Sequence, residues 1–368
     1  MNTFYKSMIL LFLVGFSFGL YASPKVEMAI LLDTSGSMEG LIEQAKSQLW
    51  QIVNELALSK RDGESIDLFL SLYEYGKSSI PSDEGYIRMI IPLSQDLDKI
   101  SEELFALTTN GGDEYCGQVI QSAINGLDWS KSNQDLKLIF IAGNEPFTQG
   151  QVNYIDACET AIENGIIVNT IFCGDFQEGV DTNWKDGADL ADGKYMNIDH
   201  NAQLVQIDAP QDQELFALTN ALNDTYIAYG TSGAAYKTRQ AEQDANAQSL
   251  GGGVLAARTK TKSSAQYKNT QWDLVDADEE GEVNIEELKE DELPEEMKEM
   301  TVEERKNYVD EKSEERKKIQ EKINQLSAER EKYIVHKRSK LSEKSLDTVI
   351  IEAIREQAVK KNYTFEHK

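Results

Sequence analysis

Between residues 26 and 224, short apolar runs alternate with longer segments in which apolar residues recur every three or four positions. Short apolar runs bounded by polar residues are typical of buried strands, and the wider spacing is typical of helices with one buried face. The pattern predicts strands at Val26–Leu32, Ile66–Tyr75, Tyr86–Leu93, Leu136–Ala142, Ile166–Phe172 and Tyr195–Ile198. It predicts helices at Leu41–Leu58, Leu97–Thr108, Glu114–Leu127, Val152–Asn164 and Gln211–Asn223.

This alternation predicts the fold class. Strands interleaved with helices of this length need crossover connections, which produce a mainly parallel sheet with helices on both faces. Residues 136–142 are almost entirely apolar, as expected for a strand that is buried on both sides. We therefore expect an α/β domain over residues 24–224, built on a doubly wound, mainly parallel six-stranded sheet.

A mostly α-helical C-terminal region is expected to follow the sheet domain. Residues 225–300 are expected to form a mixed linker or subdomain with an acidic turn. Thr301 and Glu304 match a capping box, and no Pro or Gly interrupts the chain from there to about Lys337. A second apolar helical pattern covers residues 343–360. We expect the two helices of residues 301–368 to pack as a long antiparallel hairpin.

Residues 1–22 have the pattern of a secretory signal peptide. Lys6 precedes an uncharged apolar run, Met8–Leu20, and small residues follow it. The run is too short to span a bilayer comfortably, although an uncleaved N-terminal anchor is the alternative. No later stretch is apolar enough to cross a membrane, so we expect a periplasmic or secreted protein without an integral membrane span.

The net charge narrows the choice of partner. The chain has 37 basic and 64 acidic side chains, a formal charge of -27. Such a surface repels phosphate backbones and anionic lipid, which argues against nucleic acid or bare membrane as a partner.

Three loops carry the candidate chemistry. Asp33, Ser35 and Ser37 come directly after the first predicted strand, where oxygen ligands suit a small divalent cation such as magnesium. The segment Asn110-Gly111-Gly112-Asp113-Glu114 begins a predicted helix, and Ala142-Gly143-Asn144-Glu145-Pro146 ends a predicted strand. A turn with a helix cap is the structural alternative for the first loop, since Asp and Ser are good capping residues.

On these three loops, residues 26–223 resemble a von Willebrand factor type A domain. The resemblance implies a metal-ion-dependent adhesion site in which Ser35 and Ser37 ligate the cation and Asp33 binds it directly or through water. Asp113 and Asn144 occupy the other two ligand positions. The resemblance also implies a protein partner that offers an acidic group to the vacant position of the metal. Glu114 and Glu145 would shape the rim of this site.

The chain departs from the family pattern at two of these positions. Asp113 stands where threonine is usual, and Asn144 stands where aspartate is usual. One carboxylate is gained and one is lost, so two negative ligands remain. We expect such a site to favour Mg²⁺ or Mn²⁺, with water molecules completing an octahedron. The predicted function is an exported, non-enzymatic module for divalent-metal-dependent protein binding, in adhesion or as a scaffold.

A second ion site is suggested by Asp276–Glu287. Acidic residues at its first, third, fifth and twelfth positions and Gly281 at the turn fit a Ca²⁺ loop of the EF-hand type. Glu280 fits less well because its side chain is longer than the usual Asp or Asn. We expect an acidic turn between two elements here, and a calcium-regulated scaffold is the alternative function that a Ca²⁺ loop would favour.

The chain has three cysteines, Cys116, Cys158 and Cys173. One disulfide with one free thiol, or three buried free thiols, are both compatible with the sequence. Cys173 follows a predicted strand, and with His200 it could serve a hydrolase or redox protein. We expect a buried cysteine and a surface histidine instead.

Overall fold

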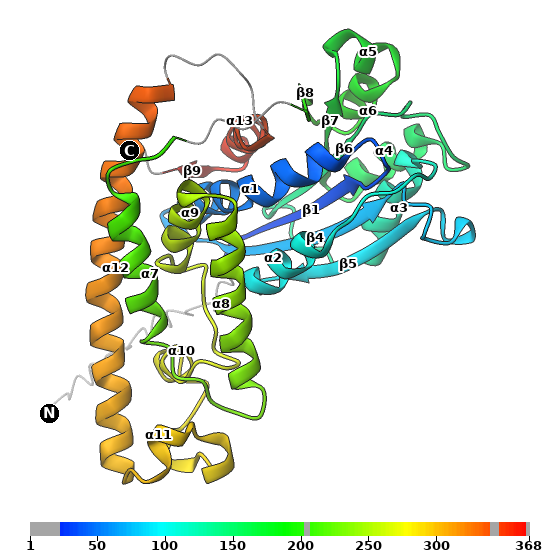
Figure 1. Ribbon diagram of the computed structural model, residues 1–368. Coiled ribbons are helices and arrows are strands. Elements are labelled where there is room, and N and C mark those ends of the chain that lie inside the picture. The colour runs from blue at the N-terminus through cyan, green and yellow to red at the C-terminus, as the bar shows by residue number, and fades with distance from the viewer. Residues whose placement is uncertain (1–22, 202–206, 339–345, 366–368) are drawn as a thin grey trace, which may run out of the picture.

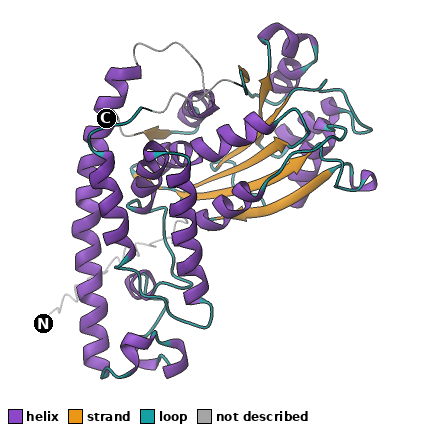
Figure 2. Ribbon diagram, in the orientation of Figure 1, coloured by secondary structure: helices purple, strands orange, loops and turns teal. Residues whose placement is uncertain are grey.

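Figure 1 shows a computed structural model of the protein, which describes residues 23–201, 207–338 and 346–365. The predicted signal peptide, residues 1–22, lies outside the described residues. The fold has two parts: a sheet domain with helices on both faces, and a helical region that extends away from it (Figure 1 and Figure 2).

The main sheet contains β1 (Lys25–Asp33), β4 (Asp67–Tyr75), β5 (Ile87–Ser94), β6 (Leu136–Gly143), β7 (Ile166–Cys173) and β8 (Tyr195–Ile198). Their order across the sheet is β5-β4-β1-β6-β7-β8. Counted along the chain, this is the 3-2-1-4-5-6 order of a doubly wound fold. All neighbours are parallel except β4 and β5. The prediction of a doubly wound, mainly parallel six-stranded sheet is confirmed.

Alternating side chains of the strands bury two separate cores. Leu32 faces the core under α1 (Glu39–Ala57) and α2 (Leu97–Ala106). Its neighbour Leu31 faces the opposite core, under α3 (Cys116–Gly126), α4 (Tyr154–Glu163) and α6 (Trp184–Leu190). Successive residues of a strand point to opposite faces, so an entirely apolar strand is buried on both sides. Short helices η1 (Ser82–Glu84) and α5 (Phe176–Asp181) lie in loops of this domain.

The helical region is organised around one long helix. It contains α7 (Asp212–Asn223), α8 (Gly233–Ser249), α9 (Gly252–Lys262), α10 (Leu274–Glu279), η2 (Ile285–Glu287), η3 (Glu290–Glu292), α11 (Glu295–Lys298) and α12 (Val302–Arg338). The predicted capping box is confirmed, since Thr301 N–H donates to Glu304 Oε2 at 2.8 Å and Glu304 N–H donates to Thr301 Oγ1 at 3.3 Å. α12 packs along α7 and also contacts α9 and α10 (Figure 1).

The last helix and strand return to the sheet domain. α13 (Leu346–Val359) packs on α1, and β9 (Tyr363–Phe365) pairs with β2 (Ser59–Arg61), which also pairs with β3 (Glu64–Ser65). The predicted antiparallel hairpin of residues 301–368 is therefore wrong, because α12 and α13 pack on different parts of the protein. The apolar face of α13 completes the core above the sheet, whereas the narrow apolar stripe of α12 needs only a helix as its neighbour.

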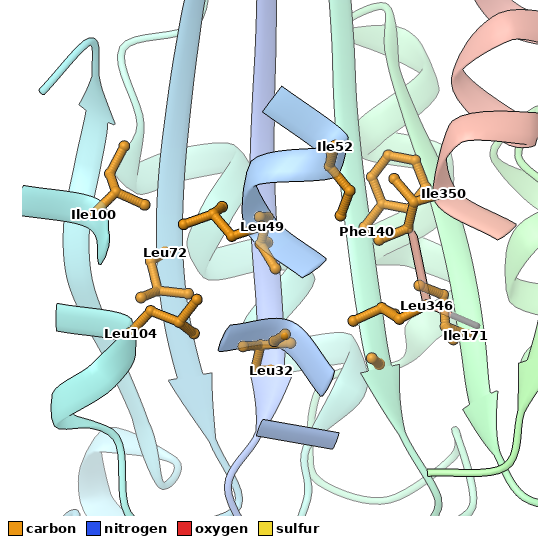
Figure 3. Close-up of a pocket in the computed structure, with 13 residues that line it drawn as sticks. Leu32, Leu49, Ile52, Leu72, Ile100, Leu104, Phe140, Ile171, Leu346 and Ile350 are labelled. Carbon is orange, nitrogen blue, oxygen red and sulfur yellow. The ribbon is translucent and has the colours of Figure 1, made fainter. Parts of the chain in front are cut away.

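A small apolar cavity lies between the sheet and the helices α1, α2 and α13. Figure 3 shows Leu346 and Ile350 of α13 beside Phe140 and Ile171 of the sheet, at a cavity of about 30 Å³. The volume admits little more than a water molecule, and the lining is almost wholly apolar. Apart from this small cavity, the core between the sheet and these helices is well packed.

We expect Ile350→Ala to lower the free energy of unfolding by about 2–5 kcal/mol, because Ile350 is 2% exposed and its loss would enlarge the cavity. Val359→Ala on the same helix is the matched control, since Val359 is 64% exposed and its truncation should cost less than about 0.5 kcal/mol. Urea unfolding followed by circular dichroism measures both. Equal small effects of the two variants would show that α13 does not pack on the sheet.

Buried charges connect the helical region to the sheet domain. Arg258 of α9 is fully buried and donates to Asp98 of α2 at 2.8 Å and to Asp244 of α8 at 2.6 Å. Lys262, also fully buried, lies 2.9 Å from Asp244. Tyr267 donates its hydroxyl to the other oxygen of Asp98 at 2.6 Å. These groups form one network in which each buried charge has an opposite partner.

Candidate metal centre

The first loop of the candidate centre begins at the last residue of β1. Thr34 N–H donates to the carbonyl of Tyr75 at 2.8 Å, which continues the pairing of β1 with β4 beyond the end of the strand. Ser35 N–H donates to Asp33 Oδ1 at 2.7 Å, and this bond turns the chain over the sheet edge. The hydroxyls of Ser35 and Ser37 lie 3.3 Å apart. One carboxylate and two hydroxyls therefore lie together at the carboxyl end of β1.

The loop after β6 adds an amide to this group. Ser37 Oγ and Asn144 Oδ1 lie 3.5 Å apart, across the point where the strand order reverses. Gly143 makes the close approach possible, because a Cβ there would lie 3.0 Å from Asp33 Oδ2 and 2.5 Å from the Tyr75 hydroxyl. The structure thus brings Asp33, Ser35, Ser37 and Asn144 together, as the sequence predicts for these four residues.

The loop before α3 presents two adjacent carboxylates in different directions. Glu114 is buried beside Asp33: a Cβ at Gly76, where φ is +79°, would lie 2.8 Å from Glu114 Cγ and 2.9 Å from Asp33 Oδ1. Asp113 is exposed, and its Oδ2 accepts a hydrogen bond from the Tyr115 hydroxyl at 3.2 Å. The carboxylate of this loop that lies next to Asp33 is therefore that of Glu114, which the sequence places on the rim.

Both buried carboxyl groups hold protons more tightly than usual. Burial raises the pKa of Asp33 to about 7, although the Ser35 N–H opposes this shift. Burial and then the negative charges of Asp33 and Glu145 raise the pKa of Glu114 to about 8. Asp33 is 0% exposed, and its Oδ2 is buried without a hydrogen-bond partner. An unpaired buried carboxylate is costly, so this oxygen fits a site where a cation would be its partner.

Gln149 connects the second and third loops. Its Oε1 accepts from the Glu114 N–H and its Nε2 donates to Glu145 Oε2, both at 3.2 Å. Sequence reasoning missed Gln149, because nothing local distinguishes it from any other polar loop residue. Sequence reasoning also assigned the ligand position of this loop to Asp113 and the rim to Glu114, whereas the structure places the Glu114 side chain beside Asp33.

The donor set is therefore mixed. No three His, Cys, Asp or Glu side chains among the described residues cluster as a metal site. The centre would rely on carboxylate, hydroxyl and amide oxygens, which are hard ligands that suit Mg²⁺ or Mn²⁺.

The second predicted ion site does not form in the structure. Residues 274–279 of the proposed EF-hand loop are helical, as α10. The carboxylate of Asp276 accepts from Arg316 Nη1 at 2.6 Å and from the Asn269 N–H at 2.7 Å. Asp273, which caps this helix, binds the same Arg316 nitrogen at 2.7 Å. A buried guanidinium thus pairs with the carboxylate at the first position of the loop, which argues against the Ca²⁺ alternative for Asp276–Glu287.

The three cysteines, Cys116, Cys158 and Cys173, are free and buried. Burial raises the pKa of the Cys173 thiol well above its usual range, and the nearby Asp33 carboxylate adds to the shift. A buried protonated thiol is a poor nucleophile. The arrangement gives no support to a hydrolase or redox role for Cys173 with His200.

No family model matches the chain, and no curated protein sequence matches it. Solved structures similar to the chain include the VWA domain of SpRpn10, at 17% identity over 49% of this chain and 90% of that one, with a TM-score of 0.38. BatB from Bacteroides thetaiotaomicron is 16% identical over 47% of this chain and 90% of that one, with a TM-score of 0.36. A mussel byssus protein, proximal thread matrix protein 1 with zinc in its MIDAS motif, is 11% identical over 48% of this chain and 42% of that one, with a TM-score of 0.35.

The strand order and the three loops at the carboxyl edge are those of a doubly wound α/β domain with one antiparallel edge strand. This agrees with the fold that the sequence predicts. Among the described residues, no helix combines the length and apolar character that a membrane span requires.

Proposed function

We propose that the protein is a divalent-metal-dependent protein-binding module, acting in adhesion or as a scaffold. The observation that carries this proposal is the buried Asp33 Oδ2 without a hydrogen-bond partner, surrounded by the hydroxyl and amide oxygens of the neighbouring loops. A cation bound there would supply the missing partner and would tie together loops that follow separate strands.

The proposed ligands are Asp33, Ser35, Ser37 and Asn144, with a further carboxylate from the loop before α3. The sequence gives that role to Asp113, whereas burial beside Asp33 favours Glu114. The cation is proposed to be Mg²⁺ or Mn²⁺, which prefer oxygen ligands in octahedral geometry. When bound, it would offer one position to an acidic group of a protein partner.

Export to the periplasm or outside the cell remains part of the proposal. It rests on the signal-peptide pattern of residues 1–22, which lie outside the described residues. Binding is favoured over catalysis because the cysteine considered as a nucleophile is buried with a raised pKa.

Calorimetric titration with MgCl₂ and MnCl₂ tests the centre. We expect Asp33→Ala to abolish binding and Glu114→Gln to weaken it by about 10–100-fold, because each loses a charged oxygen next to the cation. Asp113→Asn is the matched control and should change the affinity by less than about threefold, since exposed charges are screened. Undiminished affinity in Asp33→Ala would disprove the centre. If Asp113→Asn lowers the metal affinity more than Glu114→Gln does, Asp113 is the ligand, as the sequence predicts.

A further inference from the structure

The loops at the carboxyl edge of the sheet are strongly acidic. These loops are residues 33–39, 76–86, 108–115, 144–153, 174–175 and 199–201. They carry one basic residue, Lys77, and nine acidic residues: Asp33, Glu39, Asp83, Glu84, Asp113, Glu114, Glu145, Asp175 and Asp199. Asp33 and Glu114 are buried, but the other seven are exposed or partly exposed. A surface with this balance attracts positive charge and repels negative charge.

The single lysine does not offset this charge. Its ammonium donates to the Thr108 hydroxyl at 2.8 Å and lies 3.7 Å from the buried Glu74 carboxylate. At the centre itself, a divalent cation would face the carboxylates of Asp33, Glu114 and Glu145, so the sum would still be negative. An acidic partner group would therefore be repelled unless positive charges accompany it.

Two aromatic pairs flank the centre, each with an acidic neighbour. On the β5 side, the rings of Tyr86 and Tyr115 lie 5.7 Å apart, and Tyr115 is hydrogen-bonded to Asp113. On the β8 side, the rings of Phe176 and Tyr195 lie 5.0 Å apart. β1 and β6 lie between the two pairs in the strand order, so the pairs are on opposite sides of the centre.

The β8-side pair is open to solvent. Phe176 is 51% exposed, which is unusual for a phenylalanine, and Asp175 precedes it directly. The Tyr195 hydroxyl donates to the carbonyl of Phe176 at 2.7 Å, so the residue next to Asp175 is tied directly to the pair. An exposed aromatic face beside a carboxylate is a favourable place for a lysine or arginine side chain, because the ring attracts the cation and the carboxylate neutralises it.

We infer that the carboxyl edge binds a basic polypeptide segment, whose lysine or arginine side chains contact Phe176 with Asp175 on one side of the centre and Tyr115 with Asp113 on the other. This inference rests on the proposed function, since it describes the partner that the metal centre would hold. The acidic group on the metal and the basic groups on either side of it belong to the same segment.

Three labelled peptides of equal length test the inference by fluorescence anisotropy with the whole protein in MgCl₂. The first is lysine-rich with one central glutamate. The second replaces its lysines with glutamine, and the third replaces the central glutamate with glutamine. We expect the lysine-to-glutamine change to weaken binding at least tenfold, and raised salt to weaken binding of the first peptide, because exposed charges are screened.

Protein variants locate the contact. Phe176→Ala and Asp175→Asn are each expected to lower the affinity for the first peptide by about threefold, which is the size expected of an exposed cation–π contact. Asparagine keeps the capping of α5, where Asp175 Oδ1 accepts from the Gln177 N–H at 2.8 Å. The controls are Phe216→Ala on α7, where the ring is 39% exposed, and Glu311→Gln on the exposed side of α12. Neither control should change the affinity.

The outcomes separate the two proposals. Equal binding of the first two peptides, no binding of the lysine-rich peptides, or equal losses in the edge variants and the controls would overturn the inference. If replacing the central glutamate does not change the affinity and the peptides still bind in EDTA, the result counts against the metal-dependent function. The basic partner would still be supported.

Discussion

Replacing Asp33 with asparagine is expected to stabilise the metal-free protein at pH 8 and to remove its response to Mg²⁺. Asp33 has a pKa of about 7 in the fold, raised from 3.8 by burial. The folded protein therefore holds the proton more tightly than the unfolded chain. Stability from this group is complete below pH 4 and is lost progressively as the pH rises from about 4 to 7.

The size of this loss follows from the shift. Each pKa unit corresponds to about 1.4 kcal/mol, so an ionised Asp33 without a cation costs about 4 kcal/mol above pH 7. Asparagine resembles the protonated acid and keeps the acceptor for the Ser35 N–H, but its amide brings a buried donor that costs about 1–3 kcal/mol. We expect a net gain of about 1–3 kcal/mol at pH 8.

Urea unfolding in EDTA at pH 5 and pH 8, repeated with 10 mM MgCl₂ (roughly tenfold above a millimolar Kd), measures both effects. Wild-type protein should gain about 1.4 kcal/mol from the metal at that concentration, and Asp33→Asn should gain none. Asp113→Asn removes the same charge from an exposed position and should leave the EDTA curves unchanged. A variant less stable than wild type at pH 8 in EDTA would mean that the Asp33 carboxylate is already compensated within the fold.

The second large effect is expected at Arg258. Arg258→Met should lower the free energy of unfolding by about 3–5 kcal/mol, because it leaves two buried carboxylates with too little positive charge. Burial opposes ionisation of Asp244, yet Arg258 and Lys262 outweigh it and hold the pKa of Asp244 at about 2. The guanidinium also lies 4.8 Å from the Trp50 ring of α1, so its loss affects packing between the two parts of the protein.

Arg355→Met provides the control for Arg258→Met. Arg355 pairs with Glu55 at 2.7 Å, but its side chain is 53% exposed, so the variant should cost less than about 1 kcal/mol. Urea is the denaturant for this comparison, because guanidinium chloride is a salt and would screen the charges under test. If Arg258→Met and Arg355→Met cost the same, the buried network would not hold the helical region to the sheet.

The same network predicts a pH dependence opposite in sign to that of Asp33. The pKa of Asp244 is depressed, so its contribution is present above pH 4 and is lost as the pH falls from about 4 to 2. Asp33 and Asp244 thus illustrate one rule. A buried carboxylate destabilises the fold when it has no cation nearby and stabilises it when the fold supplies one.

Much of the sheet domain could be predicted because its signals are local. The apolar run of residues 136–142 marks a doubly buried strand, and each run also fixes where its strand ends. Asp33 and Asn144 follow two such runs, so their meeting at one sheet edge follows from parallel strands alone. The regular spacing of residues 302–338 identified the long helix in the same way.

Other features depend on contacts between residues that are far apart in the chain. α13 does not form the expected hairpin with α12, because its broad apolar face is buried against α1 and the core on that face of the sheet. Arg316, 40 residues along the chain, occupies the Asp276 carboxylate that a sequence motif assigned to Ca²⁺. The inward turn of Glu114 depends on the space beside Gly76, which belongs to another strand.

The sequence by itself determined the doubly wound sheet, the long helix and the edge where the oxygen ligands gather, because periodicity and strand ends are written in neighbouring residues. Only the tertiary structure decided which carboxylate stands beside Asp33, where α13 packs and how the helical region is attached. These features depend on burial and pairing between groups that are far apart in the chain, and a local sequence pattern carries no information about such contacts.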